Sequence, residues 1–298
     1  MTPLRLGVIG LSPGNGHPYS WSAIFNGYDH VAMEQCGFPV IPRYLEEQSF
    51  PESAISEAEV THVWAQDRAI AEHIGQAALI GTVVNNFTDM IGHVDGVLLA
   101  RDDAETHFDF AAPFLEAGIP IYVDKPLALT VDDAMRMIDR QQYPGQLFSC
   151  SALKYAPEFH LSESDRATIG RIHHIQASVP KDWNKYAIHV IEPALLVGGD
   201  AGSLLRTQTW RAHEITNVIA LYESGLQISI TSYGALPTGI TMHVHGDLGS
   251  KELTFRNTFR AFKAALSDFV QGILSRDARS PSDFMVKAIQ LVEAGRTQ

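Results

Sequence analysis

Short apolar runs alternate with helical patterns along residues 1–150. Runs of mainly apolar residues predict strands at 4–9, 60–64, 82–83, 94–100, 119–123 and 146–152. Apolar residues at helical spacing predict helices at 69–78, 108–118 and 131–142. Strands that alternate with helices are typical of a parallel, doubly wound sheet. We therefore predict an α/β domain over residues 1–150.

The pattern changes in residues 151–298. Strands are expected at 171–179, 203–212, 218–222, 226–232, 240–245 and 251–255, and helices at 259–275 and 283–294. Most of these strands are joined by short connections, which favour antiparallel pairing. We predict an α+β domain with a mostly antiparallel sheet.

Residues 27–56 interrupt the alternation in the first half. Gly37, Pro39, Pro42 and Pro51 leave no sustained helical period there. We expect this segment to be an insertion, or an elaborate connection, before the second strand. Such excursions often shape a ligand pocket.

The composition is that of an ordinary soluble globular protein, with 45% hydrophobic and 19% charged residues. A chain of 298 residues is long enough for two domains with their own cores. The formal net charge of -12 would repel both a nucleic acid backbone and an anionic membrane surface. We therefore expect no nucleic acid and no membrane partner, and no apolar run is long enough to span a bilayer.

Cysteine and histidine usage argues against a disulfide framework and against a metal site. Cys36 and Cys150 are too few for a set of disulfides and lack the paired spacing of zinc ligands. His243 and His245 share a face of a predicted strand, but no third ligand is evident. We expect no metal, and a reducing cytoplasm fits this cysteine content best.

A glycine-rich turn follows the first predicted strand. The residues from Gly10 to Pro18 permit tight turns, and a helix is expected to begin near Pro18. A strand, a glycine-rich turn and a helix in this order form the dinucleotide-binding arrangement, in which backbone N–H groups face the pyrophosphate. The spacing departs from G-x-G-x-x-G, because Ser12 and Asn15 stand where the second and third glycines belong. The candidate cofactor contacts in this turn are Gly10, Ser12, Gly14, Asn15, Gly16 and His17.

Three more cofactor candidates follow later strands. Asp67 comes after the second strand, where an acid can hydrogen-bond an adenosine ribose, while Arg68 beside it could instead meet a 2′-phosphate. The usual position of that acid holds Ala65, so NAD and NADP both stay open. His107 follows the strand at 94–100, on the edge where the nicotinamide is expected. The alternative for His107 is a solvated histidine at the start of a helix.

Asp124 and Lys125 follow the strand at 119–123, which cannot continue in regular pairing beyond Pro126. In an open α/β sheet, ligands bind at the carboxyl ends of the strands. An ammonium group there can polarise a carbonyl or a hydroxyl. The alternative is a turn with a solvated Asp-Lys pair.

Two further segments complete a set of motifs: Lys154-Tyr155-Ala156-Pro157, and Tyr186-Ala187-Ile188-His189-Val190-Ile191-Glu192 in the second half. With the glycine turn, His107 and Asp124-Lys125-Pro126 they resemble the Gfo/Idh/MocA family, the glucose–fructose oxidoreductase and inositol dehydrogenase type. The resemblance covers most of the chain. It implies an N-terminal Rossmann domain, a C-terminal domain with an open, mostly antiparallel sheet, and a homo-oligomer, either a dimer or a tetramer.

The same resemblance implies the activity and the site residues. Members generally use NAD or NADP to interconvert a secondary alcohol and a ketone on a sugar, a polyol or a related small molecule. Asp124 and Lys125 are candidate cofactor contacts. Lys125 also matches the lysine that holds the reacting oxygen. His189 matches the histidine that relays a proton or contacts the substrate oxygen. The candidate substrate contacts are Lys154, Tyr155, Trp183, Lys185, Tyr186 and His189.

Two positions depart from the family pattern. Asp124 replaces the more usual glutamate, and Lys185 stands four residues before His189, where the family often has an aspartate. On a helix, Lys185 would share a face with His189 and disfavour an imidazolium, and Glu192 would act in the opposite sense. These departures motivate an alternative function: a catalytically silent member that binds a nucleotide or metabolite as a sensor or assembly partner. Non-redox chemistry on the same fold is a third possibility.

Overall fold

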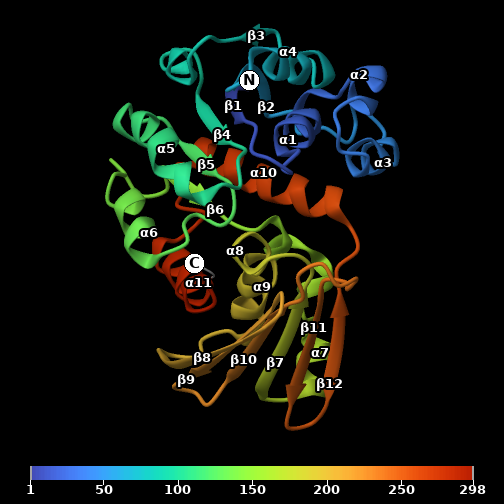
Figure 1. Cartoon of the computed structure of the whole chain (residues 1–298), viewed down its shortest axis with the longest axis vertical. Coiled ribbons are helices and arrows are strands. Elements are labelled where there is room, and N and C mark those ends of the chain that lie inside the picture. Colours follow the sequence, from blue (N-terminus) through green and yellow to red (C-terminus); the bar gives the residue numbers. More distant parts are fainter. Residues whose placement is uncertain (1, 297–298) are drawn as a thin grey trace. The chain divides into compact units, whose positions relative to one another are not determined.

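A computed structural model describes residues 2–296 of the chain (Figure 1). It divides into two compact units, and each is described by itself. The first unit comprises Met1–Leu127, Met135–Ser149 and Phe262–Ser282. The second unit comprises Ala128–Ala134, Cys150–Ala261 and Asp283–Gln298. Residues from Phe262 onward in helix α10 (Thr258–Ser275) therefore count with the first unit.

The first unit is built on a parallel sheet of six strands in the order β3-β2-β1-β4-β5-β6. The strands are β1 (Leu4–Gly10), β2 (Ala58–Ala65), β3 (Thr82–Val83), β4 (Gly96–Leu99), β5 (Ile121–Val123) and β6 (Leu147–Ser149). The connecting helices are α1 (His17–Asn26), α4 (Arg68–Ala77), α5 (His107–Glu116) and α6 (Val131–Ile138). This is the strand order of a doubly wound Rossmann sheet, so the predicted fold class is confirmed.

The order of the strands reverses between β1 and β4. Strands β2 and β3 lie on one side of β1, and β4, β5 and β6 lie on the other, so the connections leave β1 in opposite directions. In open α/β sheets a ligand binds at such a switch point, outside the carboxyl ends of the strands. The residues that follow β1 and β4 therefore define where a ligand site is expected.

Aromatic packing fixes helix α1 against the sheet. Trp21 of α1 stacks on Tyr122 of β5 with 4.8 Å between ring centroids, and Tyr122 in turn contacts Phe148 and Phe269. Trp21 and Tyr122 are each 1% exposed. Burial of large aromatic rings makes a strong contribution to core stability, so the start of α1 is held firmly beside β5.

The segment at 27–56 is a connection that contains two short helices, α2 (His30–Glu34) and α3 (Val40–Glu46). The side chain of Asp29 caps α2 by accepting a hydrogen bond from the Ala32 N–H. Pro39 precedes α3, and Pro42 lies in its first turn, where no backbone N–H is needed. These helices are too short to show a sustained period in the sequence.

The second unit contains a mixed, mostly antiparallel sheet in the order β12-β11-β7-β10-β9-β8. Its strands are β7 (Ile172–Val179), β8 (Leu204–Ala212), β9 (Ile215–Tyr222), β10 (Gln227–Ser232), β11 (Thr241–Gly246) and β12 (Ser250–Thr254). Its helices are α7 (Glu163–Ile169), α8 (Trp183–Tyr186), α9 (Ile188–Gly198) and α11 (Ser282–Ala294). Only β7 and β10 pair in parallel, which confirms the mostly antiparallel sheet.

Within residues 2–296, no helix combines the length and the apolar character that crossing a bilayer requires.

Candidate active site

Asp124 joins the end of strand β5 to the glycine-rich turn. Its carboxylate accepts a hydrogen bond from Asn15 Nδ2 at 2.8 Å and lies 2.5 Å from His17 Nδ1. It also accepts the backbone N–H of Lys125 at 2.7 Å. Asp124 is wholly buried, so these partners replace the hydration that the carboxylate loses.

The charge state of Asp124 follows from these contacts. Burial by itself raises the pKa of the carboxyl group, but the charges of His17 and Lys125 and the hydrogen bonds of His17 and Asn15 lower it more. The net effect holds the pKa of Asp124 far below its ordinary value. Asp124 is therefore a fixed negative charge beside Lys125 at neutral pH.

Lys125 is buried next to a second carboxylate, Asp102, which follows strand β4. Lys125 is 5% exposed, and its Nζ lies 3.7 Å from Asp102 Oδ2. Ser12 Oγ donates to Asp102 Oδ1 at 2.7 Å, and the Asp102 N–H lies 3.0 Å from Ser12 Oγ. Asp102 was not among the predicted site residues. Its position after a buried strand at the switch point is the signal that could have identified it.

The glycines of the turn have different reasons to be glycine. A Cβ atom on Gly10 would lie 2.2 Å from Cγ of Pro18, so only glycine allows β1 and α1 to approach this closely. Gly14 has φ of 82°, which favours glycine, and no atom lies within 4 Å of the place its Cβ would take. The turn is therefore closely packed at Gly10 and open above Gly14.

The turn also offers free hydrogen-bond donors. The backbone N–H groups of Ser12, Gly14 and Gly16 make no hydrogen bond to other residues in the range 2–296. The first turn of α1 carries no acidic residue that would repel an anion. Free backbone donors at an open turn and a helix N-terminus fit the pyrophosphate of a dinucleotide.

Asp67 and Arg68 lie just beyond the end of β2. Asp67 caps helix α4 by accepting the Ala69 N–H at 2.8 Å. Arg68 pairs with Glu72 at 2.8 Å and donates to Asn85 Oδ1 at 3.0 Å. Both side chains already have partners, so this end of the sheet does not distinguish NAD from NADP.

His107 is wholly buried at the start of α5, so it is not the solvated histidine of the alternative interpretation. Its Nδ1 lies 3.0 Å from the Leu127 carbonyl oxygen, and its Nε2 lies 2.8 Å from the Arg101 carbonyl oxygen. These two carbonyls belong to the loops after β4 and β5. His107 therefore ties together the loops that carry Asp102 and Lys125.

In the second unit, Ser151, His189 and Glu192 form a buried polar cluster. Ser151 Oγ lies 2.8 Å from His189 Nδ1, and the Ser151 N–H donates to Glu192 Oε2 at 2.9 Å. His189 and Glu192 both project from α9 and are 8% and 4% exposed. The ring of Tyr186 meets the imidazole of His189 edge-on, with 5.3 Å between centroids. Neither Ser151 nor Glu192 was among the predicted site residues.

Burial raises the pKa of Glu192 to about 7, although the positive charge of Lys154 and the Ser151 N–H both act to lower it. The ammonium of Lys154 lies 5.0 Å from the centre of the Tyr155 ring, a cation–π contact. Lys154 and Tyr155, both predicted substrate contacts, thus lie beside this cluster.

The other predicted substrate contacts, Trp183, Tyr186 and Lys185, have different surroundings in the second unit. Trp183 is 1% exposed and its Nε1 donates to the Val292 carbonyl oxygen at 2.8 Å, as in a core residue. Lys181 Nζ donates a hydrogen bond to the Tyr186 hydroxyl oxygen. Lys185 lies in α8, whose N-terminus is capped by Asp182.

The structure brings the predicted residues together in two groups. In the first unit, Ser12, Asn15, His17, Asp124 and Lys125 form one connected network. In the second unit, Tyr186 and His189 are in contact. Lys125 and His189, the two catalytic candidates, belong to different units.

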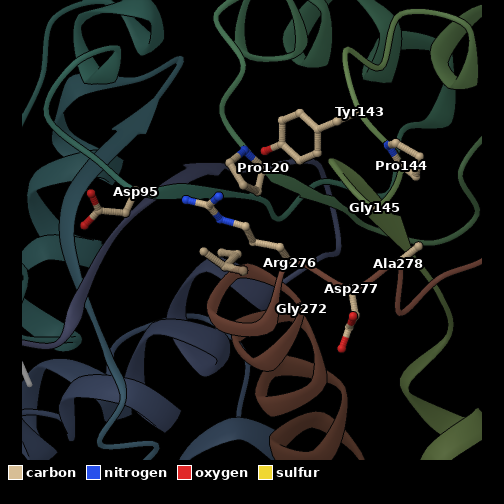
Figure 2. A pocket seen from close by; sticks show the side chains of 10 residues that line it. Asp95, Pro120, Tyr143, Pro144, Gly145, Gly272, Arg276, Asp277 and Ala278 are labelled. Carbon is tan, nitrogen blue, oxygen red and sulfur yellow. The ribbon is translucent and has the colours of Figure 1, made fainter.

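A separate cavity of about 730 Å³ opens at the amino edge of the parallel sheet (Figure 2). Its lining includes Asp95, Pro120 and Gly145, which precede β4, β5 and β6, and Arg276, which follows α10. Figure 2 shows the Arg276 side chain extending toward Asp95. No predicted site residue lines this cavity, which lies at the edge of the sheet opposite Lys125.

Comparison with known proteins supports the family resemblance. Residues 36–150 match the family model Gfo/Idh/MocA, described as an oxidoreductase family with an NAD-binding Rossmann fold. A search of curated proteins by sequence found no match.

Solved structures share the fold over nearly the whole chain. Myo-inositol dehydrogenase from Lactobacillus casei, in complex with NAD(H) and myo-inositol, has a TM-score of 0.76 at 14% identity, with 99% of this chain and 94% of that chain covered. Myo-inositol 2-dehydrogenase from Lactobacillus plantarum has a TM-score of 0.74 at 15% identity, with 98% and 96% covered. UDP-N-acetylglucosamine 3-dehydrogenase GnnA from Acidithiobacillus ferrooxidans has a TM-score of 0.73 at 13% identity, with 99% and 97% covered.

Proposed function

We propose that the chain is an NAD(P)-dependent dehydrogenase or reductase. The premise is that residues 36–150 belong to the NAD-binding Rossmann fold of the Gfo/Idh/MocA oxidoreductase family. The proposed reaction interconverts a secondary alcohol and a ketone on a sugar, a polyol or a related small molecule. The similar structures named as inositol and amino-sugar dehydrogenases support this class of substrate.

The buried ammonium group of Lys125 is the observation that carries the proposal. It lies at the carboxyl end of β5, where α/β folds bind ligands, and it is 5% exposed. A cation that is shielded from water interacts strongly with a negative charge that develops on a bound oxygen. We propose that Lys125 holds the reacting oxygen of the substrate.

The glycine-rich turn is proposed as the cofactor site. The backbone N–H groups of Ser12, Gly14 and Gly16 would hold the pyrophosphate, and Asp67 and Arg68 would lie near the adenosine ribose. The bound nicotinamide supplies or accepts the hydride. His107 would support the site indirectly, since its ring nitrogens face carbonyl oxygens of the two loops.

The second unit is proposed to contribute the substrate contacts. His189 is the residue that contacts the substrate oxygen or exchanges a proton with it, because an imidazole suits either role near neutral pH. Lys154, Tyr155 and Tyr186 lie around the same cluster and are the further candidates.

Binding and turnover test the proposal separately. Calorimetric titration with NAD, NADH, NADP and NADPH should show binding of at least one of the four, and no heat with any of them would contradict the proposal. Turnover is then followed by nicotinamide absorbance with a panel of sugars and polyols. Lys125→Ala should abolish turnover and leave cofactor binding mostly intact, whereas Lys287→Ala, at an exposed lysine, should change neither.

The silent alternative has its own signature in the same experiments. Cofactor binding without absorbance change across the whole panel would favour a sensor or assembly partner. The Ser12 side chain in the turn motivates this alternative, since it is bonded to Asp102 where the motif has a glycine.

A further inference from the structure

The hydrogen bond between Ser151 and His189 determines what the histidine can do. We infer that Ser151 is a positioning residue that holds neutral His189 in the tautomer with its proton on Nε2, so that the ring serves as a hydrogen-bond donor. The inference rests on the proposed contact between His189 and the substrate oxygen. It goes further because it assigns the histidine a direction of hydrogen bonding.

The direction follows from the bonds that Ser151 makes. Its Oγ accepts the backbone N–H of Leu153 at 3.2 Å, so that hydrogen bond does not use the hydroxyl proton. The hydroxyl proton needs an acceptor. Across residues 2–296, the structure places His189 Nδ1 at hydrogen-bond distance for this role, 2.8 Å from Ser151 Oγ. Ser151 is wholly buried, and an unpaired hydroxyl there would cost free energy. The hydroxyl therefore donates to Nδ1, which leaves Nδ1 without a proton and Nε2 with one.

Ser151 is itself held in place from two sides. Its N–H donates to Glu192 Oε2 at 2.9 Å, and its carbonyl oxygen accepts the Lys154 N–H at 3.2 Å. Glu192 lies three residues after His189 on α9, so both side chains project from the same side of the helix. One serine is thus bound through its backbone to Glu192 and through its side chain to His189.

The ring of His189 has little freedom to change its orientation. Tyr186 packs edge-on against it, with an interplanar angle of 68°, and the imidazole is 8% exposed. A ring flip would turn Nδ1 away from Ser151 and leave the buried hydroxyl without an acceptor. Packing and hydrogen bonding therefore favour the same orientation.

This arrangement favours one chemical role over another. A neutral imidazole with its proton on Nε2 has no lone pair there, so this nitrogen donates a hydrogen bond and does not abstract a proton. A neutral imidazole can act in this way to polarise a carbonyl oxygen. His189 is therefore expected to hold the substrate oxygen by hydrogen-bond donation.

Nuclear magnetic resonance of the ring nitrogens tests the inference without any assay of turnover. Histidine labelled with 15N gives different long-range 1H–15N patterns for the two neutral tautomers, and the His189 signal is identified by its loss in His189→Gln. The full chain, recorded at a pH where His189 is neutral, should show the Nε2–H pattern. An Nδ1–H pattern would overturn the inference.

Substitution of the serine gives the second readout. Ser151→Ala should shift the His189 signals toward a mixture of tautomers, and Ser151→Thr, which keeps a hydroxyl, should restore the Nε2–H pattern. The matched control is Ser232→Ala, at a wholly buried serine whose Oγ has no hydrogen-bond partner across residues 2–296. This control should leave His189 unchanged. An unaltered Nε2–H pattern in folded Ser151→Ala would show that the serine does not set the tautomer.

Activity distinguishes a failure of this inference from a failure of the proposed function. If a substrate is found, Ser151→Ala should lower kcat on the order of tenfold with cofactor affinity unchanged, and Ser151→Thr should recover most of the loss. Full activity in Ser151→Ala would overturn the inference and leave the dehydrogenase proposal intact. Absence of dehydrogenase activity, with the Nε2–H pattern present and dependent on Ser151, would remove only the proposed function.

Discussion

Glu192→Gln is expected to change how the stability of the protein depends on pH. The pKa of Glu192 is raised from an ordinary value of 4.5 to about 7 in the folded chain, chiefly by burial. The folded state therefore binds a proton more tightly than the unfolded state between these values. The stability that this proton confers is fully present below pH 4.5 and is lost as the pH rises through 7.

The magnitude follows from the difference between the two pKa values. A difference between 4.5 and about 7, at about 1.4 kcal/mol for each pKa unit, gives a loss of about 3 kcal/mol across this range. Glutamine is neutral in both states and its amide oxygen can still accept the Ser151 N–H. The variant should therefore lack this loss, and its stability relative to the natural chain should rise with pH.

Thermal unfolding between pH 4.5 and pH 8, followed by circular dichroism, measures the effect. The difference in Tm between Glu192→Gln and the natural chain should grow by about 5 °C over this range, because an unfolding entropy of about 2.1 cal/mol/K per residue gives about 1.6 °C for each kcal/mol in a chain of 298 residues. Comparison of the two proteins at each pH cancels the contribution of the other titrating groups. Glu252→Gln, at an exposed position on β12, is the control and should track the natural chain. Parallel curves for the two proteins would refute the raised pKa of Glu192.

Two further substitutions test packing and the glycine-rich turn. Ser12→Gly restores a motif glycine but removes the hydroxyl bonded to Asp102. The free energy of unfolding, measured by chemical denaturation, should fall by about 1–3 kcal/mol, and an increase would contradict this expectation. Gly295→Ala would place a Cβ atom 2.2 Å from Cε2 of Trp183. Overpacking should lower the free energy of unfolding by about 1–3 kcal/mol, followed by tryptophan fluorescence, and an unchanged unfolding midpoint would show that the site can relax.

The sequence predicted the strands of both halves well because the signal is local, whereas α7, α8 and α9 were not among the predicted helices. Apolar runs and helical spacing depend on neighbours within a few residues, and the six strands expected in residues 1–150 all form. The parallel pairing of β7 with β10 is different. These strands are separated by two others in the sequence, so their pairing depends on tertiary packing that no local pattern records.

The contacts of the candidate site were less predictable for the same physical reason. Asp124 meets His17 across 107 positions of the sequence, and Asp102 meets Ser12 across 90. Residue types identified Asp124, Lys125 and the turn as candidates, but only the fold shows which side chains are partners. Likewise, the sequence drew attention to the charge of Glu192. Its hydrogen bond with the Ser151 N–H forms only because the loop after β6 packs on α9, which no local pattern records.

The departures from the glycine pattern have a physical explanation in the fold. Ser12 and Asn15 occupy the places of the missing glycines, and their side chains bond to Asp102 and Asp124, the acids that follow β4 and β5. Glycine at either position would leave a buried carboxylate with one partner fewer, which is costly in a low-dielectric interior. The altered turn and the two acids therefore act as one unit, in which side chains hold the loops beside Lys125 while backbone N–H groups stay free for a ligand. A sequence pattern based on glycine alone treats these residues as defects, whereas the fold uses them to fix the surroundings of the lysine.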